Sequence, residues 1–349
     1  MEGHRLSLDA MRGVAALIIV AFHRRWWIGD AQFLHSAYLA VDFFFCLSGV
    51  VIGMAYDHRL RTSMPLSTFA AVRLIRLYPM LLIGTLIGAV YFLASSSRTT
   101  GIDGASILSV GFALAIIPNI FNTASLFPVN GPVWSLFFEL LVNLIYAACL
   151  RLGTPFRRVP LILGLLLLWL SFETPPEGVG KLGVSRAEFS GGFARAAFSF
   201  VFGVLIFQWQ RDGVIPSWRV PLWLLLLVLA AVLCVDGSIV GARAYDLACV
   251  GIVFPLIVAL GISSPPSEHM AKFAGFLGAM SYPLYATHYP MFDIFDRIFA
   301  RADPTLPGPV KFAIALAFIL TSNRFFLVHV DAPLRAWLST RWRSRAINM

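Results

Sequence analysis

The chain has 349 residues, of which 58% are hydrophobic and 13% charged, and its formal net charge is +9. No soluble core needs so many long apolar segments, so the composition excludes a soluble protein and predicts a polytopic membrane protein. The positive charge does not indicate a nucleic-acid partner, because the arginines are scattered at the edges of apolar runs, where the positive-inside rule explains them.

Ten apolar segments are long enough to cross, or nearly cross, a bilayer. They span residues 10–27, 37–56, 69–94, 132–150, 159–172, 193–209, 221–235, 247–262, 273–295 and 310–330. The segments follow one another closely, so we expect one membrane-embedded, all-α domain over residues 1–349, with no soluble extracytoplasmic domain. A weaker segment at 107–120 is ambiguous, and Pro118 lies near its end.

The number of crossings decides on which side of the membrane each basic loop lies. If residues 107–120 do not cross, two groups of basic residues share one side, which the positive-inside rule assigns to the cytoplasm. One group is Arg5, Arg59 and Arg61; the other is Arg151, Arg157, Arg158, Arg211, Arg219, Arg341, Arg343 and Arg345. We therefore expect about ten transmembrane helices, both termini in the cytoplasm, and a re-entrant or interfacial segment at 107–120.

The first predicted span, "LDAMRGVAALIIVAFHRR", contains ionisable residues, which are costly in lipid unless they face the interior of the bundle. Arg12 and His23 are eleven residues apart, which places them about 20° apart around a helix and about 16 Å apart along it. They could line one face of a cavity. The alternatives are an Arg12 that snorkels to the interface and an interfacial His23 beside Arg24 and Arg25.

The second predicted span begins near Asp42, on the same side as His23. A carboxylate there could hold the tautomer of the imidazole and raise its basicity, as in a catalytic dyad. A helix cap is the alternative. Ser48 and Gly49 in the same helix are expected to allow close approach of another helix.

The third and fourth predicted spans carry further polar groups. Arg73 and Arg76, in "FAAVRLIRLYP", lie one turn apart and could clamp a phosphate, or they could simply set the topology. Glu139 lies about two turns into "NGPVWSLFFELLVNLIY", after Trp134 and Ser135. No Lys or Arg in its own helix neutralises Glu139, so it needs a partner from elsewhere in the bundle.

The ninth predicted span contains "SYPLYATHYP", in which four polar residues can face one groove because they are spaced by three or four positions. They are Ser281, Tyr282, Tyr285 and His288. Interhelical hydrogen bonding is the alternative, above all for the first two. Asp331 and Pro333, in "HVDAPLRAW", are expected to cap or end the last helix.

Six motifs now stand in chain order: Arg-x10-His, Asp-Phe-Phe-x-x-x-Ser-Gly, Arg-x-x-Arg, Trp-Ser-Leu-x-x-Glu, Ser-Tyr-x-x-Tyr-x-x-His and a terminal acidic-x-Pro. Together they resemble the acyltransferase type 3 family of integral membrane acyltransferases over nearly the whole chain. Two positions depart from the pattern. Phe137 replaces the usual serine, and Pro283 interrupts the Ser-Tyr motif.

The resemblance implies transfer of an acyl group, usually acetyl from acetyl-CoA or another acyl-CoA, to a hydroxyl of a cell-surface or exported carbohydrate. O-antigen, exopolysaccharide and glycolipid are examples of such acceptors. The resemblance also implies a catalytic His23, an essential Arg12, a functional Glu139, and contacts of Arg73 and Arg76 with the donor. The site would lie in the inner (cytoplasmic) membrane, and no metal is expected.

In the mechanism we expect, Arg73 and Arg76 hold the donor phosphates at the cytoplasmic mouth of a polar channel. His23, oriented by Asp42 or Glu139, deprotonates the acceptor hydroxyl or carries the acyl group itself, and we favour the general base. The alternative class is a proton-coupled transporter or flippase, which also uses intramembrane charges, although we find no inverted repeats. A sensor that has lost catalysis is a third possibility, against which the intact His23 argues.

Overall fold

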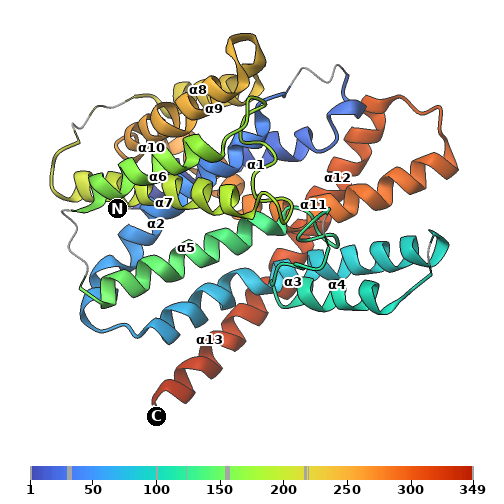
Figure 1. Cartoon of the computed structure of the whole chain (residues 1–349), viewed down its shortest axis with the longest axis horizontal. Helices are drawn as coiled ribbons and strands as arrows, with labels where there is room; N and C mark the ends of the chain where they lie inside the picture. The colour runs from blue at the N-terminus through green and yellow to red at the C-terminus, as the bar shows by residue number, and fades with distance from the viewer. Residues whose placement is uncertain are drawn as a thin grey trace.

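The computed structural model describes residues 2–29, 34–99, 101–122, 124–153, 158–215, 218 and 220–347. Within these ranges all regular elements are helical (Figure 1). The helices of the first half are α1 (Glu2–Phe22), α2 (Ala40–Thr62), α3 (Leu66–Thr99), α4 (Gly104–Leu114), α5 (Val133–Arg151) and α6 (Val159–Glu173). Those of the second half are α7 (Phe189–Arg211), α8 (Leu222–Cys234), α9 (Ala242–Ala248), α10 (Phe254–Ile262), α11 (Glu268–Ala302), α12 (Gly308–Phe326) and α13 (Ala332–Ile347).

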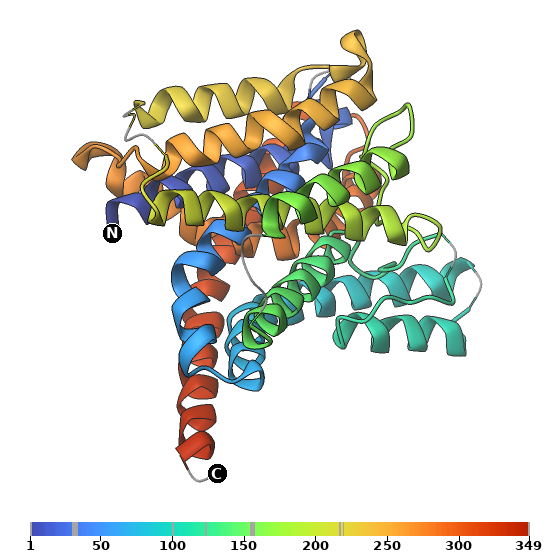
Figure 2. The same cartoon turned by 60° about the vertical axis from the view of Figure 1, so that its left-hand side comes forward.

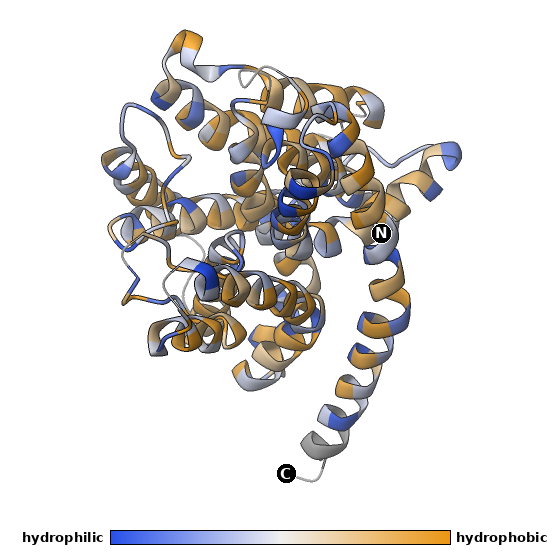
Figure 3. Cartoon of the chain, turned by 90° about the vertical axis from the view of Figure 1, so that its right-hand side faces the viewer, coloured by the Kyte–Doolittle hydropathy of each residue, from blue (hydrophilic) through white to orange (hydrophobic). Residues whose placement is uncertain are grey.

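Each of the ten predicted segments forms a helix, and the ribbon is predominantly hydrophobic in colour (Figure 3). Among the described residues, six helices are long and apolar enough to cross a membrane: Ala37–Thr62, Leu66–Thr99, Val133–Arg151, Phe189–Arg211, Ala242–Ile262 and Gly308–Trp342. Helices α4, α6 and α8 are apolar but shorter. The chain is therefore an all-helical membrane protein with several apolar helices. Of the basic residues used to predict the topology, Arg157 and Arg219 lie outside the described residues, as do the side chains of Arg5, Arg343 and Arg345.

The ambiguous segment is helical only over α4, whose 11 residues span about 16 Å, or half of a bilayer core. Asp103 caps α4 by accepting a hydrogen bond from the backbone N–H of Ser106. The connection that follows is irregular and packs against the bundle, where the Asn130 amide donates to the backbone oxygen of Ala286 at 2.9 Å. Helix α5 thus begins beside the middle of α11 (Figure 1).

Glycines bring α2 and α7 into backbone contact. A Cβ atom added to Gly49 would lie 2.1 Å from the backbone oxygen of Phe200, and one added to Gly203 would lie 2.0 Å from that of Cys46. Such distances leave no room for a side chain, so the predicted close approach of a helix at Gly49 is confirmed.

Helix α11 lies parallel to α1 and α3, in the centre of the bundle. Residues that come later in α1 contact residues that come later in α11: Arg12 contacts Ser281, and His23, directly after α1, contacts His288. The contacts of α3 follow the same order, since Tyr282 donates to Leu77 and the position of Gly84 abuts Ala286. These three helices carry most of the polar residues predicted to form the site.

The prediction that Asp331 and Pro333 end the last helix is wrong. Helix α12 passes through a π-helical turn, Leu327–Asp331, into α13, which extends away from the body of the protein (Figure 2). The wide π turn lies immediately before Pro333, which has no backbone N–H to donate, and so the chain passes the proline without ending the helix.

Candidate functional site

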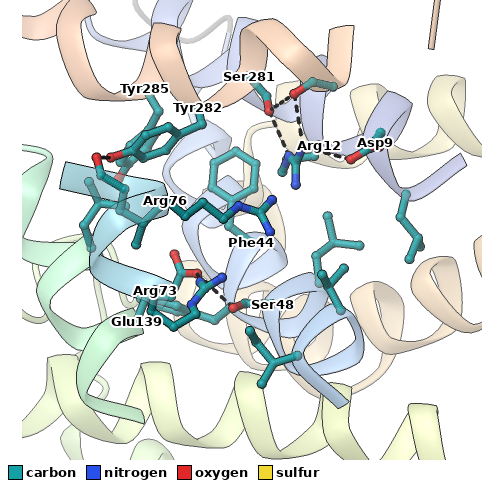
Figure 4. A pocket seen from close by; sticks show the side chains of 18 of the residues that line it. Asp9, Arg12, Phe44, Ser48, Arg73, Arg76, Glu139, Ser281, Tyr282 and Tyr285 are labelled. Carbon is teal, nitrogen blue, oxygen red and sulfur yellow. Dashed lines mark hydrogen bonds and ion pairs between the residues drawn. The ribbon is translucent and has the colours of Figure 1, made fainter. Parts of the chain in front are cut away.

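A cavity of about 580 Å³ lies between α1, α2, α3, α5, α11 and the junction of α12 with α13 (Figure 4). The predicted residues that line it are Arg12, Ser48, Arg73, Arg76, Ser135, Glu139, Ser281, Tyr282 and Tyr285. They come from five helices and from positions up to 273 residues apart. The volume lies in the range typical of small-molecule sites.

Arg12 is fixed on one wall of the cavity. Its guanidinium forms an ion pair with Asp9 at 2.8 Å and donates to the Ser281 hydroxyl at 2.8 Å and to the backbone oxygen of Gly278 at 3.0 Å. It lines the cavity, as predicted, and is anchored to α11.

Glu139 has the partners that its helix could not provide. The carboxylate accepts from Arg73 at 3.0 Å and from the Ser48 hydroxyl at 2.9 Å. Arg73 is only 5% exposed, so its pairing with Glu139 satisfies two charges that would be costly to bury alone. Of the two arginines of the third span, Arg73 is therefore the one that a carboxylate already engages.

Arg76 lines the same cavity and is exposed. Among the residues that the structure describes, its guanidinium has neither a hydrogen-bond partner nor an ion-pair partner, and in Figure 4 it extends between Phe44 and the Arg73–Glu139 pair. It offers an unpaired positive charge to a ligand.

Tyr285 forms the link between the cavity and a pair of histidines. Its phenol lies 2.6 Å from the Ser135 hydroxyl, and its ring centroid lies 6.0 Å from that of His288. His288 is buried and contacts His23, with 3.1 Å between His288 Nε2 and His23 Nδ1. Neither histidine lines the cavity itself, so the prediction that His288 faces the same groove as Ser281, Tyr282 and Tyr285 is wrong.

The backbone determines the tautomers of this pair when both rings are neutral. His288 Nδ1 lies 2.8 Å from the backbone oxygen of Leu284 and 3.0 Å from that of Tyr285, so it is protonated and donates. His288 Nε2 is then an acceptor for Nδ1–H of His23, which also lies 2.9 Å from the backbone oxygen of Ile19. The unprotonated nitrogen of His23 is consequently Nε2, as a general base or nucleophile requires.

The expectation that Asp42 or Glu139 orients His23 is wrong. Asp42 is fully buried and accepts two hydrogen bonds of 2.7 Å from Arg195, which also donates to the backbone oxygens of Val179 and Tyr38. Glu139 is held by Arg73 and Ser48, as described above. His288 is the residue that contacts His23.

Trp134 was predicted to line the cavity, but its ring lies elsewhere. It is buried 5.3 Å from the guanidinium carbon of Arg195 and packs against Gly183. Its role in the structure is to cover the Asp42–Arg195 pair.

Two residues of this region escaped the sequence analysis. Arg195 lies in the middle of the apolar run "GGFARAAFSFVFG" and could have been found by the reasoning that selected Glu139. Arg335 lines the cavity next to Asp331 but follows a proline that wrongly indicated the end of the helix.

Comparison with known proteins places this site in a family. The family model described as "Acyltransferase domain" matches residues 5–323. The chain belongs to the acyltransferase type 3 family. A protein of Rhizobium radiobacter, "Protein 2 in picA locus", is 38% identical over 156 residues, which cover 41% of this chain and 80% of that protein. No solved structure matches the chain.

Proposed function

We propose that this protein is an O-acyltransferase that takes an acyl group, in the simplest case acetyl, from an acyl-CoA and transfers it to a carbohydrate hydroxyl. The observation that carries the proposal is the position of the His23–His288 pair, which lies just beyond Tyr285 at the edge of an arginine-lined cavity. Membership in an acyltransferase family supplies the reaction class.

The cavity suits the donor, because guanidinium groups bind phosphates through charge-assisted hydrogen bonds. Arg76, with no partner of its own among the described residues, is the first candidate for the donor phosphates. The thioester end of the pantetheine arm would then extend along α11 towards the histidines. His288 lies six residues beyond Tyr282 on that helix, or about 9 Å.

In the reaction, Nε2 of His23 accepts the proton of the acceptor hydroxyl as the oxygen attacks the thioester carbonyl carbon. The new C–O bond forms and the C–S bond breaks, and the proton passes from His23 to the departing thiolate of CoA. His288 keeps Nε2 of His23 unprotonated by accepting from Nδ1–H. The carbohydrate acceptor, such as O-antigen, exopolysaccharide or a glycolipid, rests on the family resemblance.

We further propose ten crossings of the inner (cytoplasmic) membrane, with both termini in the cytoplasm. Two observations support this topology. Helices α1 and α11 are parallel, as a first and a ninth crossing must be, and α4 is too short to add a crossing. The mouth of the cavity would then face the cytoplasm, where acyl-CoA is made.

The test is transfer of radiolabelled acetyl from acetyl-CoA into glycan, lipid and protein fractions by membranes that contain the wild type or His23→Ala. We expect label in a glycan or glycolipid fraction that depends on His23. His58→Ala removes an exposed histidine away from the cavity and serves as the matched control, with transfer unchanged. A wild type that neither transfers the label nor binds CoA would contradict the proposal and favour the transporter.

A further inference from the structure

The junction between α12 and α13 forms part of the cavity wall. Leu327, Asp331 and Arg335 all line the cavity from this junction, and the π turn Leu327–Asp331 widens the helix at that point. π turns interrupt the regular ladder of helical hydrogen bonds and are frequent at functional sites. Helix α13 also contacts α3, which carries Arg73 and Arg76.

Asp331 and Arg335 form an ion pair one helical turn apart. The Asp331 side chain is only 2% exposed, and its Oδ1 atom is buried without a hydrogen-bond partner in the described part of the chain. Arg335 is 34% exposed. Asp331 pairs with one nitrogen of the Arg335 guanidinium, and no other described residue accepts a hydrogen bond from the remaining N–H groups of Arg335.

The charges that line the cavity are almost balanced. In the part of the chain that the structure describes, four arginines line it: Arg12, Arg73, Arg76 and Arg335. Arg12 pairs with Asp9, Arg73 with Glu139 and Arg335 with Asp331. Arg12 also donates to the Ser281 hydroxyl on α11. Arg73 binds Glu139 on α5, and that carboxylate also accepts from Ser48 on α2. Arg335 differs from these two, because Asp331, on its own helical segment, is the only partner of its guanidinium among the described residues, and because its side chain is the most exposed of the three, at 34%.

We propose that Arg335 is a further ligand for the phosphates of the acyl donor, acting from the part of the cavity wall that the junction of α12 with α13 forms. This inference rests on the proposed function, since it assigns a residue to the donor site. The pairing with Asp331 places the guanidinium at the cavity, and the N–H groups left over bind phosphate oxygens. A planar guanidinium with five donors can serve a carboxylate and a phosphate together.

The test compares two thioester donors that differ only in their phosphates and nucleotide, acetyl-CoA and S-acetyl-pantetheine. In Arg335→Gln we expect kcat/KM for acetyl-CoA to fall about tenfold or more, as loss of a charge-assisted contact predicts. We expect kcat/KM for S-acetyl-pantetheine to change less than twofold, because that donor has no phosphate. Binding of CoA to the purified full chain should weaken in parallel.

The matched control is Arg341→Gln, which removes an exposed arginine of the same helix that does not line the cavity, and which should leave both donors unaffected. Equal losses with both donors in Arg335→Gln would show a merely structural role and overturn the inference. No loss with either donor would overturn it as well. Failure of the wild type to bind CoA would instead contradict the proposed function, so the two failures are distinguishable.

Discussion

His288 gives His23 what a carboxylate gives the histidine of a catalytic triad, an acceptor for Nδ1–H that leaves Nε2 unprotonated. Replacing it by phenylalanine keeps an aromatic ring beside Phe292 but removes the acceptor. We expect kcat of His288→Phe to fall about 10²-fold or more, the order contributed by general-base catalysis, while KM for the donor stays within twofold. Steady-state kinetics in proteoliposomes measure both. A variant with normal kcat would show that His288 does not position His23.

Asp42 and Arg195 form a buried ion pair, and breaking such a pair leaves one charge without compensation. We expect Asp42→Asn and Arg195→Met each to lower the stability of the protein by about 3–5 kcal/mol. The double variant Asp42→Leu/Arg195→Met should recover most of that loss, because it leaves no unpaired charge. Thermal unfolding in detergent provides the comparison. If Asp42→Asn kept full stability but lost acyl transfer, Asp42 would belong to the chemistry after all.

Helical spacing was informative about faces and uninformative about partners. It indicated that Ser281, Tyr282, Tyr285 and His288 share a face of one helix, and the first three do line the cavity, whereas His288 lies beyond it. It could not identify the partner of Asp42, since Arg195 lies 153 residues away on another helix. The contact between His23 and His288 could not be predicted for the same reason, because the two residues are 265 positions apart in the sequence.

At the scale of helices, the contact between α2 and α7 depends on Gly49. A methyl group there would collide with the backbone of α7, which cannot move aside as a side chain can. We expect Gly49→Ala to destabilise the protein by about 1–3 kcal/mol, the usual cost of overpacking. Gly164→Ala in α6 is the control, because a Cβ atom there meets nothing within 4 Å. Equal melting temperatures for the two variants would contradict this packing.

The apolar segments were predicted from the sequence because length and hydrophobicity directly determine whether a helix can lie in a bilayer. Two irregular elements were less accessible. The weak segment at 107–120 contains a helix that ends at Leu114, and neither its end nor the path of the following connection follows from periodicity. The π turn before Pro333 was missed because a proline ordinarily ends a helix.

For the whole molecule, the parallel arrangement of α1, α3 and α11 links the two ends of the proposed pathway. Arg12 contacts Ser281, a little before the middle of α11, and His23 contacts His288 about two turns further along. The cavity therefore lies towards the ends of these helices that the positive-inside rule assigns to the cytoplasm, with the histidine pair deeper in the bundle. A donor and an acceptor could then approach from opposite sides.

The most direct test of this account is a sided transfer assay. Membrane vesicles of both orientations would receive radiolabelled acetyl-CoA, which does not cross the bilayer, and label in glycan would be compared before and after permeabilisation. We predict transfer without permeabilisation only where acetyl-CoA meets the face at which α1 begins, and its loss in His23→Ala. Transfer only from the face at which α1 ends would contradict the account.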